Sequence, residues 1–163
     1  MVDAPPTAVG LDSCILIELF DEKSKHRQDI RQIFNAAERG ELVLVISTMV
    51  HAEVAATKSN ATPHQIWEIR RAMSQTCFEP VELSVPLGIL AADLAREHRL
   101  KPYDAIHAAT CVNKGVEWLL TFDKKVLRAD GKIMTSASDR SKRLRIVPPE
   151  SFCKIFYRPL FGR

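Results

Sequence analysis

Four acidic residues stand at the edges of apolar segments of the sequence: Asp12, Glu53, Asp104 and Asp123. Asp12 lies between the apolar runs AVGL and CILI, and Asp123 ends the strand-like segment 116–123. An unpaired carboxylate at an apolar boundary is costly, because it loses hydration without gaining a partner. Four such groups in one chain suggest a shared counter-ion, and a divalent metal ion is the simplest candidate. The pattern therefore predicts a metal-dependent hydrolase of phosphodiesters.

Each acid also has a simpler explanation when it is considered alone. Asp12 could only cap a helix, Asp104 could only complement a helix dipole, and Asp123 could only form a turn. Glu53 could be a solvated helix residue, although its neighbours at helical spacing carry no charge. The metal hypothesis therefore depends on the four acids as a set.

Three further residues lie close to these acids in the sequence. Ser13 and Thr121 could orient a carboxylate or a metal-bound water, although a helix cap and a strand threonine are the simpler roles. His107 lies one turn beyond Asp104, but a single helical histidine is more often structural, and we leave it outside the catalytic set. Mg²⁺ or Mn²⁺ suits oxygen ligands, and a second ion ~3.5–4 Å away would stabilise the leaving oxygen.

The segments around the acids alternate between β-rich apolar runs and amphipathic stretches. Strands are expected at 7–11, 42–46, 78–83, 117–121 and 144–147. Helices are expected to begin after Asp12, at Ser24, after Ser47, at Thr62, at Ser84 and at Tyr103. Strands separated by one or two helices predict an α/β fold, a three-layer αβα sandwich with a central, mostly parallel sheet of four to five strands.

Such a sheet would bring the acids together. Ligands of parallel α/β folds bind beyond the carboxyl ends of the strands. Asp12 follows the first expected strand and Asp123 ends the fourth, while Asp104 lies in the first turn of its helix. Glu53 is expected about two turns into the helix after the second strand. All four carboxylates can therefore meet at one edge of the sheet.

The composition is that of an ordinary globular protein. The chain has 163 residues, 46% of them hydrophobic and 26% charged, which suits a single domain. No apolar run reaches the ~18 residues of a membrane span, and the N-terminus is a poor signal peptide. The four cysteines show no zinc-type pairing, which favours free thiols and a cytoplasmic location.

Basic residues gather after the last acid. The net charge is only +3, but the range 124–145 holds eight basic residues against two acids. A basic stretch beside an acidic site suits a substrate with a phosphate backbone. Candidate phosphate contacts are Lys124, Lys125, Arg128 and Arg143. The alternative is a solvated loop without a ligand.

Four segments, taken in order, resemble the PIN-domain nucleases, and most closely the VapC-type toxins of bacterial toxin–antitoxin pairs. These segments are 11-LDSCILIE-18, 47-STMVHAEV-54, 103-YDAIHAAT-110 and 119-LLTFD-123. The resemblance covers residues 8 to about 127. It implies a PIN-like nuclease domain at 7–149, with a C-terminal extension at 150–163 packed on or beside it. The composition of residues 1–6 suggests a disordered lead-in before this domain.

The resemblance also implies an activity and partners. The family fold is a flavodoxin-like αβα sandwich that acts as a Mg²⁺- or Mn²⁺-dependent endoribonuclease, so the candidate phosphate contacts would bind RNA. The acidic positions of the family fall on Asp12, Glu53, Asp104 and Asp123, and its accompanying polar position falls on Thr121. Relatives are usually homodimers, inhibited by a small antitoxin whose tail wraps the toxin and can place a basic side chain among the acids.

Two departures and two alternatives accompany the resemblance. The segment 128–142 is longer than expected, and the extension after Pro149 adds aromatic and basic residues. One alternative is a housekeeping PIN nuclease that acts in RNA processing or on structured DNA. The other is a non-catalytic PIN module that binds RNA or protein, although a scaffold would not need four intact acids. Loss of metal-dependent RNA cleavage on Asp12→Asn would separate an enzyme from a scaffold.

Overall fold

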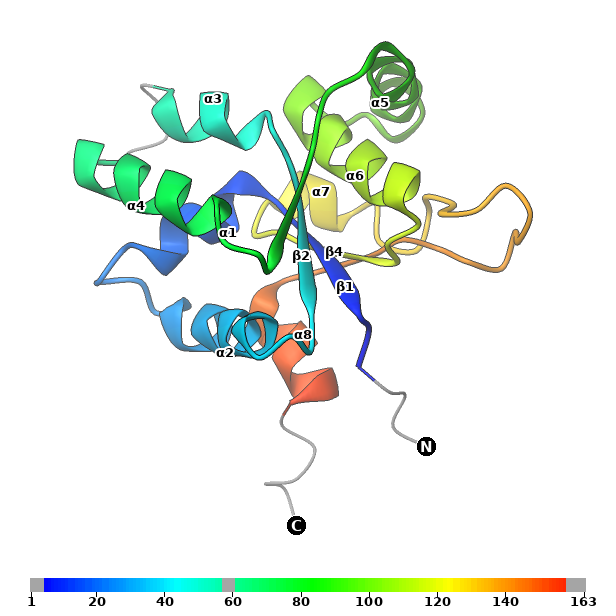
Figure 1. Ribbon diagram of the computed structural model, residues 1–163. Coiled ribbons are helices and arrows are strands. Elements are labelled where there is room, and N and C mark those ends of the chain that lie inside the picture. Colours follow the sequence, from blue (N-terminus) through cyan, green and yellow to red (C-terminus); the bar gives the residue numbers. More distant parts are fainter. Residues whose placement is uncertain (1–4, 57–60, 158–163) are drawn as a thin grey trace.

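The core of the protein is a parallel sheet of five strands. The structure is a computed structural model that describes residues 5–56 and 61–157. The strands are β1 (Ala8–Leu11), β2 (Val43–Ser47), β3 (Phe78–Val81), β4 (Trp118–Leu120) and β5 (Arg145–Val147). Their order across the sheet is β3-β2-β1-β4-β5, and every neighbouring pair is parallel (Figure 1). The predicted α/β class and parallel sheet are confirmed.

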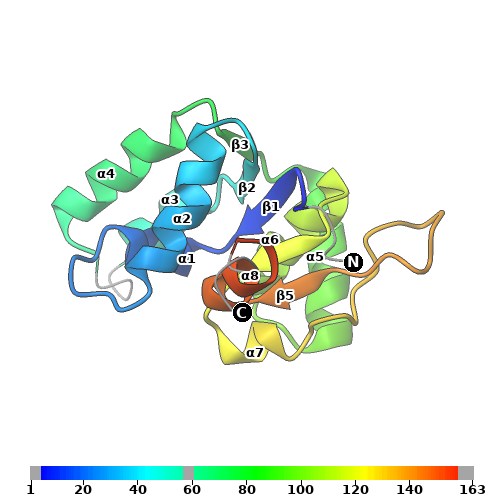
Figure 2. The ribbon, with the colours of Figure 1, turned by 90° about the horizontal axis from the view of Figure 1, so that it is seen from below.

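Helices cover both faces of this sheet. They are α1 (Ser13–Leu19), α2 (Arg27–Glu38), α3 (Val50–Ala55), α4 (Pro63–Met73), α5 (Val85–His98), α6 (Pro102–Lys114), α7 (Lys124–Leu127) and α8 (Pro149–Phe156). Figure 2 shows α1, α2 and α4 on one side and α5 on the other.

Alternation along the strands produces the two faces. In β2, Leu44 and Ile46 belong to the hydrophobic cluster beneath α1, α2 and α4, whereas Val45 belongs to the cluster beneath α5 and α6. Successive strand residues point to opposite faces, and a run that is apolar at every position therefore fits a sheet covered on both sides. This arrangement is the predicted three-layer αβα sandwich.

The structure confirms the predicted helix starts at Thr62 and Ser84, and it shows how α4, α5 and α6 are capped. Thr62 and Gln65 form a complete capping box at the start of α4, because the Gln65 N–H donates to Thr62 Oγ1 at 3.2 Å and the Thr62 N–H donates to Gln65 Oε1 at 2.7 Å. Ser84 caps α5 through the N–H of Leu87 at 3.4 Å. Gly115 ends α6 in the left-handed region, with φ of 65°.

Other helix boundaries differ from the prediction. Ser47 ends β2 instead of capping α3: its Oγ accepts the N–H of Met49 at 3.2 Å, and the helix begins only at Val50. Glu53 consequently lies in the first turn of α3 and not two turns in. The helix expected from Ser24 begins at Arg27, after a turn. The short helix α7 was not expected; Asp123 caps it.

One glycine is required by close packing at the centre of the sheet. A Cβ at Gly10 in β1 would lie 2.1 Å from Cys111 Sγ on α6. Cys111 is 1% exposed. Its sulfur fills the space that any larger side chain at position 10 would need. Gly10 therefore lets α6 lie directly on β1, which brings the start of α6 toward the end of that strand.

Two further segments of the chain are an arm after α7 and the C-terminal extension. An arm, residues 131–144, projects from the molecule after α7 (Figures 1 and 2), and its flanks meet at a bridge between Met134 and Arg143. The C-terminal extension forms α8, whose Phe152 and Cys153 are buried. The expected division at 1–6, 7–149 and 150–163 stays a prediction, since residues 1–4 and 158–163 lie outside the described part. Within that part, no helix is long and apolar enough to cross a membrane.

Candidate metal centre

The carboxyl ends of β1 and β4 lie side by side and place two of the acids. Leu11 pairs with Leu120 in parallel register, and the N–H of Asp12 donates to the Leu120 carbonyl at 3.1 Å. Asp12 follows β1 directly, and Thr121 and Asp123 follow β4. The predicted gathering of strand-end residues therefore results from the register of this one strand pair.

Asp12 is held by the hydroxyl groups of two residues that follow β1 and β4. It is 6% exposed. Its Oδ2 accepts a hydrogen bond from Thr121 Oγ1 at 2.6 Å, and its Oδ1 accepts one from Ser13 Oγ at 3.2 Å. Asp12 also caps α1, because its carboxylate accepts the N–H of Cys14 at 3.5 Å. The predicted alternative role as a helix cap is therefore present, and it is compatible with binding a metal ion. The two predicted supporting residues both contact this carboxylate.

Glu53 reaches the same place from α3 and meets a histidine that the sequence prediction left out. His107 Nε2 lies 2.7 Å from Glu53 Oε2 and 3.7 Å from Asp12 Oδ1. One ligand atom from each of Asp12, Glu53 and His107 can be chosen so that all lie within 4.8 Å of one another. These side chains form the compact part of the site.

The spacing in α6 could have indicated His107. Residues three apart share a helix face, so His107 follows Asp104 toward the acids. Its partner Glu53 is 54 residues away in the chain, which is why local sequence reasoning treated the histidine as structural. Burial alone would lower the pKa of His107, but its hydrogen bond with Glu53 and the charges of Asp12, Glu53 and Asp104 outweigh burial and raise that pKa.

The pKa of Asp104 is raised by burial and by the neighbouring acids. Burial, followed by the charges of Asp12 and Asp123, raises the pKa of Asp104 from 3.8 to about 6, although Lys101 and His107 act in the opposite direction. Its Oδ2 is buried and has no hydrogen-bond partner within the part of the chain that the structure describes. Asp104 therefore has one carboxylate oxygen available, in a region of negative potential.

Asp123 has a capping role and a place near the cluster. Its Oδ1 accepts the N–H groups of Lys125 at 2.6 Å and Val126 at 3.4 Å at the start of α7. Its charge acts on Asp104. Asp104 and Asp123 thus lie outside the 4.8 Å group of ligand atoms but inside its electrostatic field.

This donor set fits a divalent cation. Like charges at short range favour protonation or a bound cation, and the raised pKa of Asp104 shows the first of these tendencies. Hard ions such as Mg²⁺ and Mn²⁺ take carboxylate oxygens. The unpartnered Oδ2 of Asp104 and the converging oxygens of Asp12 and Glu53 are of that type.

The four candidate phosphate contacts divide into two places. Lys124 and Lys125 are exposed in the first turn of α7, directly after Asp123, and Arg128 ends that helix. Arg143 lies in the arm, two residues before β5 begins at Arg145. Because β4 and β5 are parallel, Arg143 lies at the edge of the sheet opposite to the acids.

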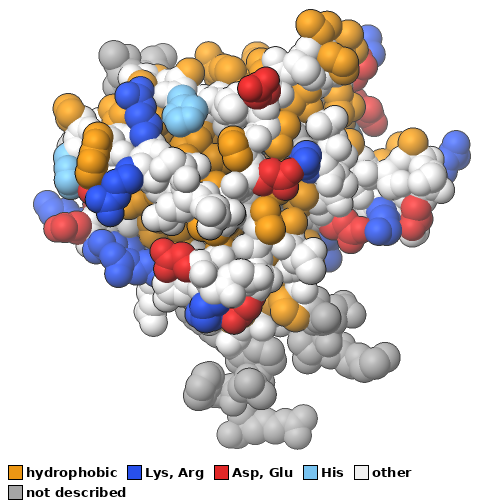
Figure 3. All heavy atoms as spheres, in the orientation of Figure 1, with side chains coloured by type: hydrophobic (Ala, Val, Ile, Leu, Met, Phe, Trp, Pro, Cys, Tyr) orange, Lys and Arg blue, Asp and Glu red, His pale blue; other side chains and the backbone are white. Residues whose placement is uncertain are grey.

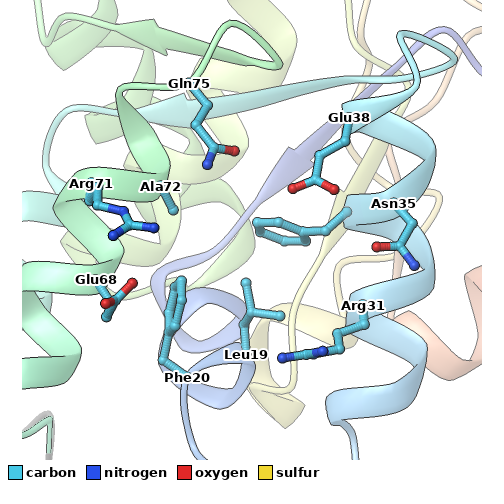
Figure 4. Close-up of a pocket in the computed structure, with 10 residues that line it drawn as sticks. Leu19, Phe20, Arg31, Asn35, Glu38, Glu68, Arg71, Ala72 and Gln75 are labelled. Atoms are coloured by element: carbon cyan, nitrogen blue, oxygen red, sulfur yellow. The ribbon is translucent and has the colours of Figure 1, made fainter.

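A pocket of about 290 Å³ opens between α2 and α4 at the far end of α1 (Figure 4). Its apolar lining residues are Leu19, Phe20, Phe34 and Ala72, and its charged ones are Arg31, Glu38, Glu68 and Arg71. At its rim, Arg71 lies over the ring of Trp67, with 5.3 Å to the ring centroid. Trp67 is 54% exposed.

A parallel αβα sandwich with an acidic cluster at the carboxyl edge of its sheet defines a class of proteins to which known families can be compared. The family model described as PIN domain matches residues 9–132. The chain belongs to the PIN-domain family, as its sequence segments predicted.

One solved structure similar to this chain is VapBC2 from Rickettsia felis bound to a DNA fragment from their promoter. The likeness has a TM-score of 0.53 and 17% sequence identity, and it covers 74% of this chain and 92% of that chain. At this identity it shows the shared fold. A search of curated proteins found none with significant similarity.

Proposed function

We propose that this protein is an endoribonuclease that depends on Mg²⁺ or Mn²⁺. The observation that carries the proposal is the convergence of Asp12 and Glu53 within 4.8 Å, beside an Asp104 whose pKa is raised to about 6. Membership of the PIN-domain family supports the same reading. In this proposal Asp12, Glu53, Asp104 and Asp123 hold the ion.

The residues around the ion have separate tasks. When bound, the cation activates water for in-line attack on a phosphodiester and offsets charge on the leaving oxygen. Ser13 and Thr121 fix both oxygens of Asp12 by hydrogen bonds. Lys124 and Lys125, exposed beside Asp123, attract the RNA backbone to this edge of the sheet.

Cleavage of a single-stranded RNA by the purified protein tests the activity. We expect cleavage with Mg²⁺ or Mn²⁺, none with EDTA, and none for Asp12→Asn, whose amide keeps the size of the carboxylate but removes its charge. Asp93→Asn is the matched control, because Asp93 lies on α5 with a side chain 61% exposed. Activity that survives both EDTA and Asp12→Asn would rule out the proposed mechanism.

We further propose that the protein is the toxin of a toxin–antitoxin pair in the cytoplasm. Its fold resembles that of a chain in the VapBC2 structure, and none of its four cysteines forms a disulfide within the described residues. The pocket between α2 and α4 offers an apolar floor with charged rims for a segment of the antitoxin. Exposed Trp67 beside Arg71 is the kind of pair that dominates binding energy at interfaces.

Co-expression tests this partnership. We expect a small protein encoded beside this gene to co-purify with the chain and to relieve growth arrest caused by the chain alone. Trp67→Ala should weaken the complex ~10-fold or more and leave RNA cleavage by the free protein intact. If no neighbouring small protein binds, the housekeeping alternative takes precedence.

We also propose a homodimer. Large apolar side chains are exposed at the start of α5: Val85 is 78% exposed, Ile89 60% and Leu83 40%. Figure 3 shows hydrophobic side chains gathered over this helix. A contiguous apolar patch on a soluble protein commonly marks an interface, and a second copy of the chain is the partner we assign to it.

A further inference from the structure

His107 contacts two of the proposed metal-holding residues from inside the protein. Its side chain is 2% exposed, and it projects from α6 one turn after Asp104. Its Nε2 faces Glu53 Oε2 at 2.7 Å, with Asp12 Oδ1 at 3.7 Å. The short distance to Glu53 is that of a strong hydrogen bond to a carboxylate. The question is whether this nitrogen donates a proton or binds the ion.

The other ring nitrogen decides the question. His107 Nδ1 is buried and has no hydrogen-bond partner among the described residues. A ligating imidazole carries its proton on the second nitrogen and nearly always donates it to an oxygen. A metal bound at Nε2 would therefore leave an N–H unpaired in the core, and a buried unpaired donor is costly. With the proton on Nε2, only an acceptor stays unpaired, which native structures tolerate more often.

We propose that His107 is a positioning residue: its Nε2–H donates to Glu53 Oε2, and this bond directs the other oxygen of Glu53 toward the ion. This inference rests on the proposed metal-dependent function. His107 is thus not itself a ligand, although its nitrogen lies among the ligand atoms.

The geometry explains why Glu53 needs such a partner. Thr121 holds one oxygen of Asp12, and the N–H of Lys125 holds one oxygen of Asp123. Both aspartates have short side chains that follow the ends of strands. Glu53 has a longer side chain on the six-residue helix α3, and its flexibility costs entropy when it is ordered. His107 supplies for Glu53 the fixed donor that Thr121 supplies for Asp12.

Mn²⁺ affinity, measured by electron paramagnetic resonance on metal-depleted protein, tests the inference without any RNA. His107→Leu fills the space but cannot donate, and it should weaken Mn²⁺ binding ~10-fold or more. His107→Gln keeps an N–H donor at similar reach and should stay within ~3-fold of the unchanged protein. Thr110→Val is the matched control: Thr110 lies in the same helix, is 2% exposed, and donates only to the carbonyl of Ile106 at 2.7 Å.

The echo-modulation spectrum of bound Mn²⁺ separates donor from ligand. We expect no coupling from a directly bound imidazole nitrogen. A coupling that is present in the unchanged protein and absent from His107→Gln would make His107 a ligand and overturn the inference. If His107→Leu fails to fold, this spectrum and the His107→Gln affinity decide the matter.

The affinities also separate this inference from the proposed function. Equal Mn²⁺ affinity of His107→Leu and the Thr110→Val control would overturn the role of His107 alone. Equal weakening in His107→Gln and His107→Leu would overturn it too, because a donor would then not suffice. If neither the unchanged protein nor Thr110→Val bound Mn²⁺, the metal-dependent function would fall, and the inference with it.

Discussion

Asp104 should make the metal-free protein less stable above pH 6 than it would be with an amide at this position. The folded state raises the pKa of Asp104 to about 6 by burial and by the charges of Asp12 and Asp123. A carboxyl group with a raised pKa binds its proton more tightly in the folded chain than in the unfolded chain. The contribution of this carboxyl group to stability is therefore fully present below about pH 4 and is lost as the pH rises through about 6. Asp104→Asn removes this loss, because an amide does not ionise.

The size of the effect follows from the same pKa. The value rises from 3.8 to about 6, and one pKa unit corresponds to about 1.4 kcal/mol. The full difference would be about 3 kcal/mol, but Asp104 is only half-buried and solvent screens part of the interaction. We therefore expect Asp104→Asn to increase the free energy of unfolding by about 1–2 kcal/mol at pH 8, and by only a few tenths at pH 4.

Urea denaturation of metal-depleted protein at pH 4 and pH 8 measures this difference. Asp93→Asn serves as control, since an exposed surface change of this kind should stay within about 0.5 kcal/mol at both pH values. Adding Mn²⁺ at pH 8 should stabilise the unchanged protein more than Asp104→Asn, because the variant lacks an oxygen that we propose binds the ion. The gain in stability and the loss of ion binding thus have one cause.

The result that would refute this reasoning is simple to recognise. Asp104→Asn could be less stable than the unchanged protein at pH 8, or the difference could be independent of pH. Either result would mean that the charges of the other acids do not raise the pKa of Asp104. The acidic cluster would then be a set of separate caps, and the electrostatic argument for a metal would lose its support.

Three further predictions test separate features. Gly10→Ala should cost ~1–3 kcal/mol of stability in urea denaturation, and Cys111→Ala should recover most of that loss, because the new Cβ would lie 2.1 Å from Cys111 Sγ; an unchanged loss would place the clash elsewhere. Thr121→Val should weaken Mn²⁺ binding ~10-fold, since Asp12 loses its 2.6 Å donor; equal affinity would mean that Ser13 suffices. Ile89→Asp should convert a dimer to a monomer in light scattering, and a dimer that persists would exclude the apolar patch as its interface.

The sequence was informative where structure depends on neighbouring residues. The helix starts at Thr62 and Ser84 were predicted correctly, because each cap needs only a few adjacent positions. The parallel sheet followed from the alternation of strands and helices. Glu53 was misplaced within its helix because the chain turns at Thr48 and Met49 before α3 begins.

Contacts between distant segments were harder to predict. The bond of His107 to Glu53 spans 54 residues and depends on how closely α6 approaches α3. The position of Arg143 at the edge of the sheet opposite to the acids depends on the path of the arm. The loop composition of the arm does not predict this path. Predicting either would require the three-dimensional register that only the fold provides.

The arm closes on itself at its base. The N–H of Gly131 donates to the Leu144 carbonyl at 3.0 Å, and the N–H of Leu144 donates to the Ile133 carbonyl at 2.8 Å. The two flanks therefore stay together whatever residues join them, and β5 keeps its place. The tip of the arm lies at the edge of the sheet opposite to the acids. In the sequence it follows residue 132, where the family match ends. Fluorophores, affinity peptides or surface tethers can be attached there, so that single molecules can be observed while the edge that we propose binds RNA stays open.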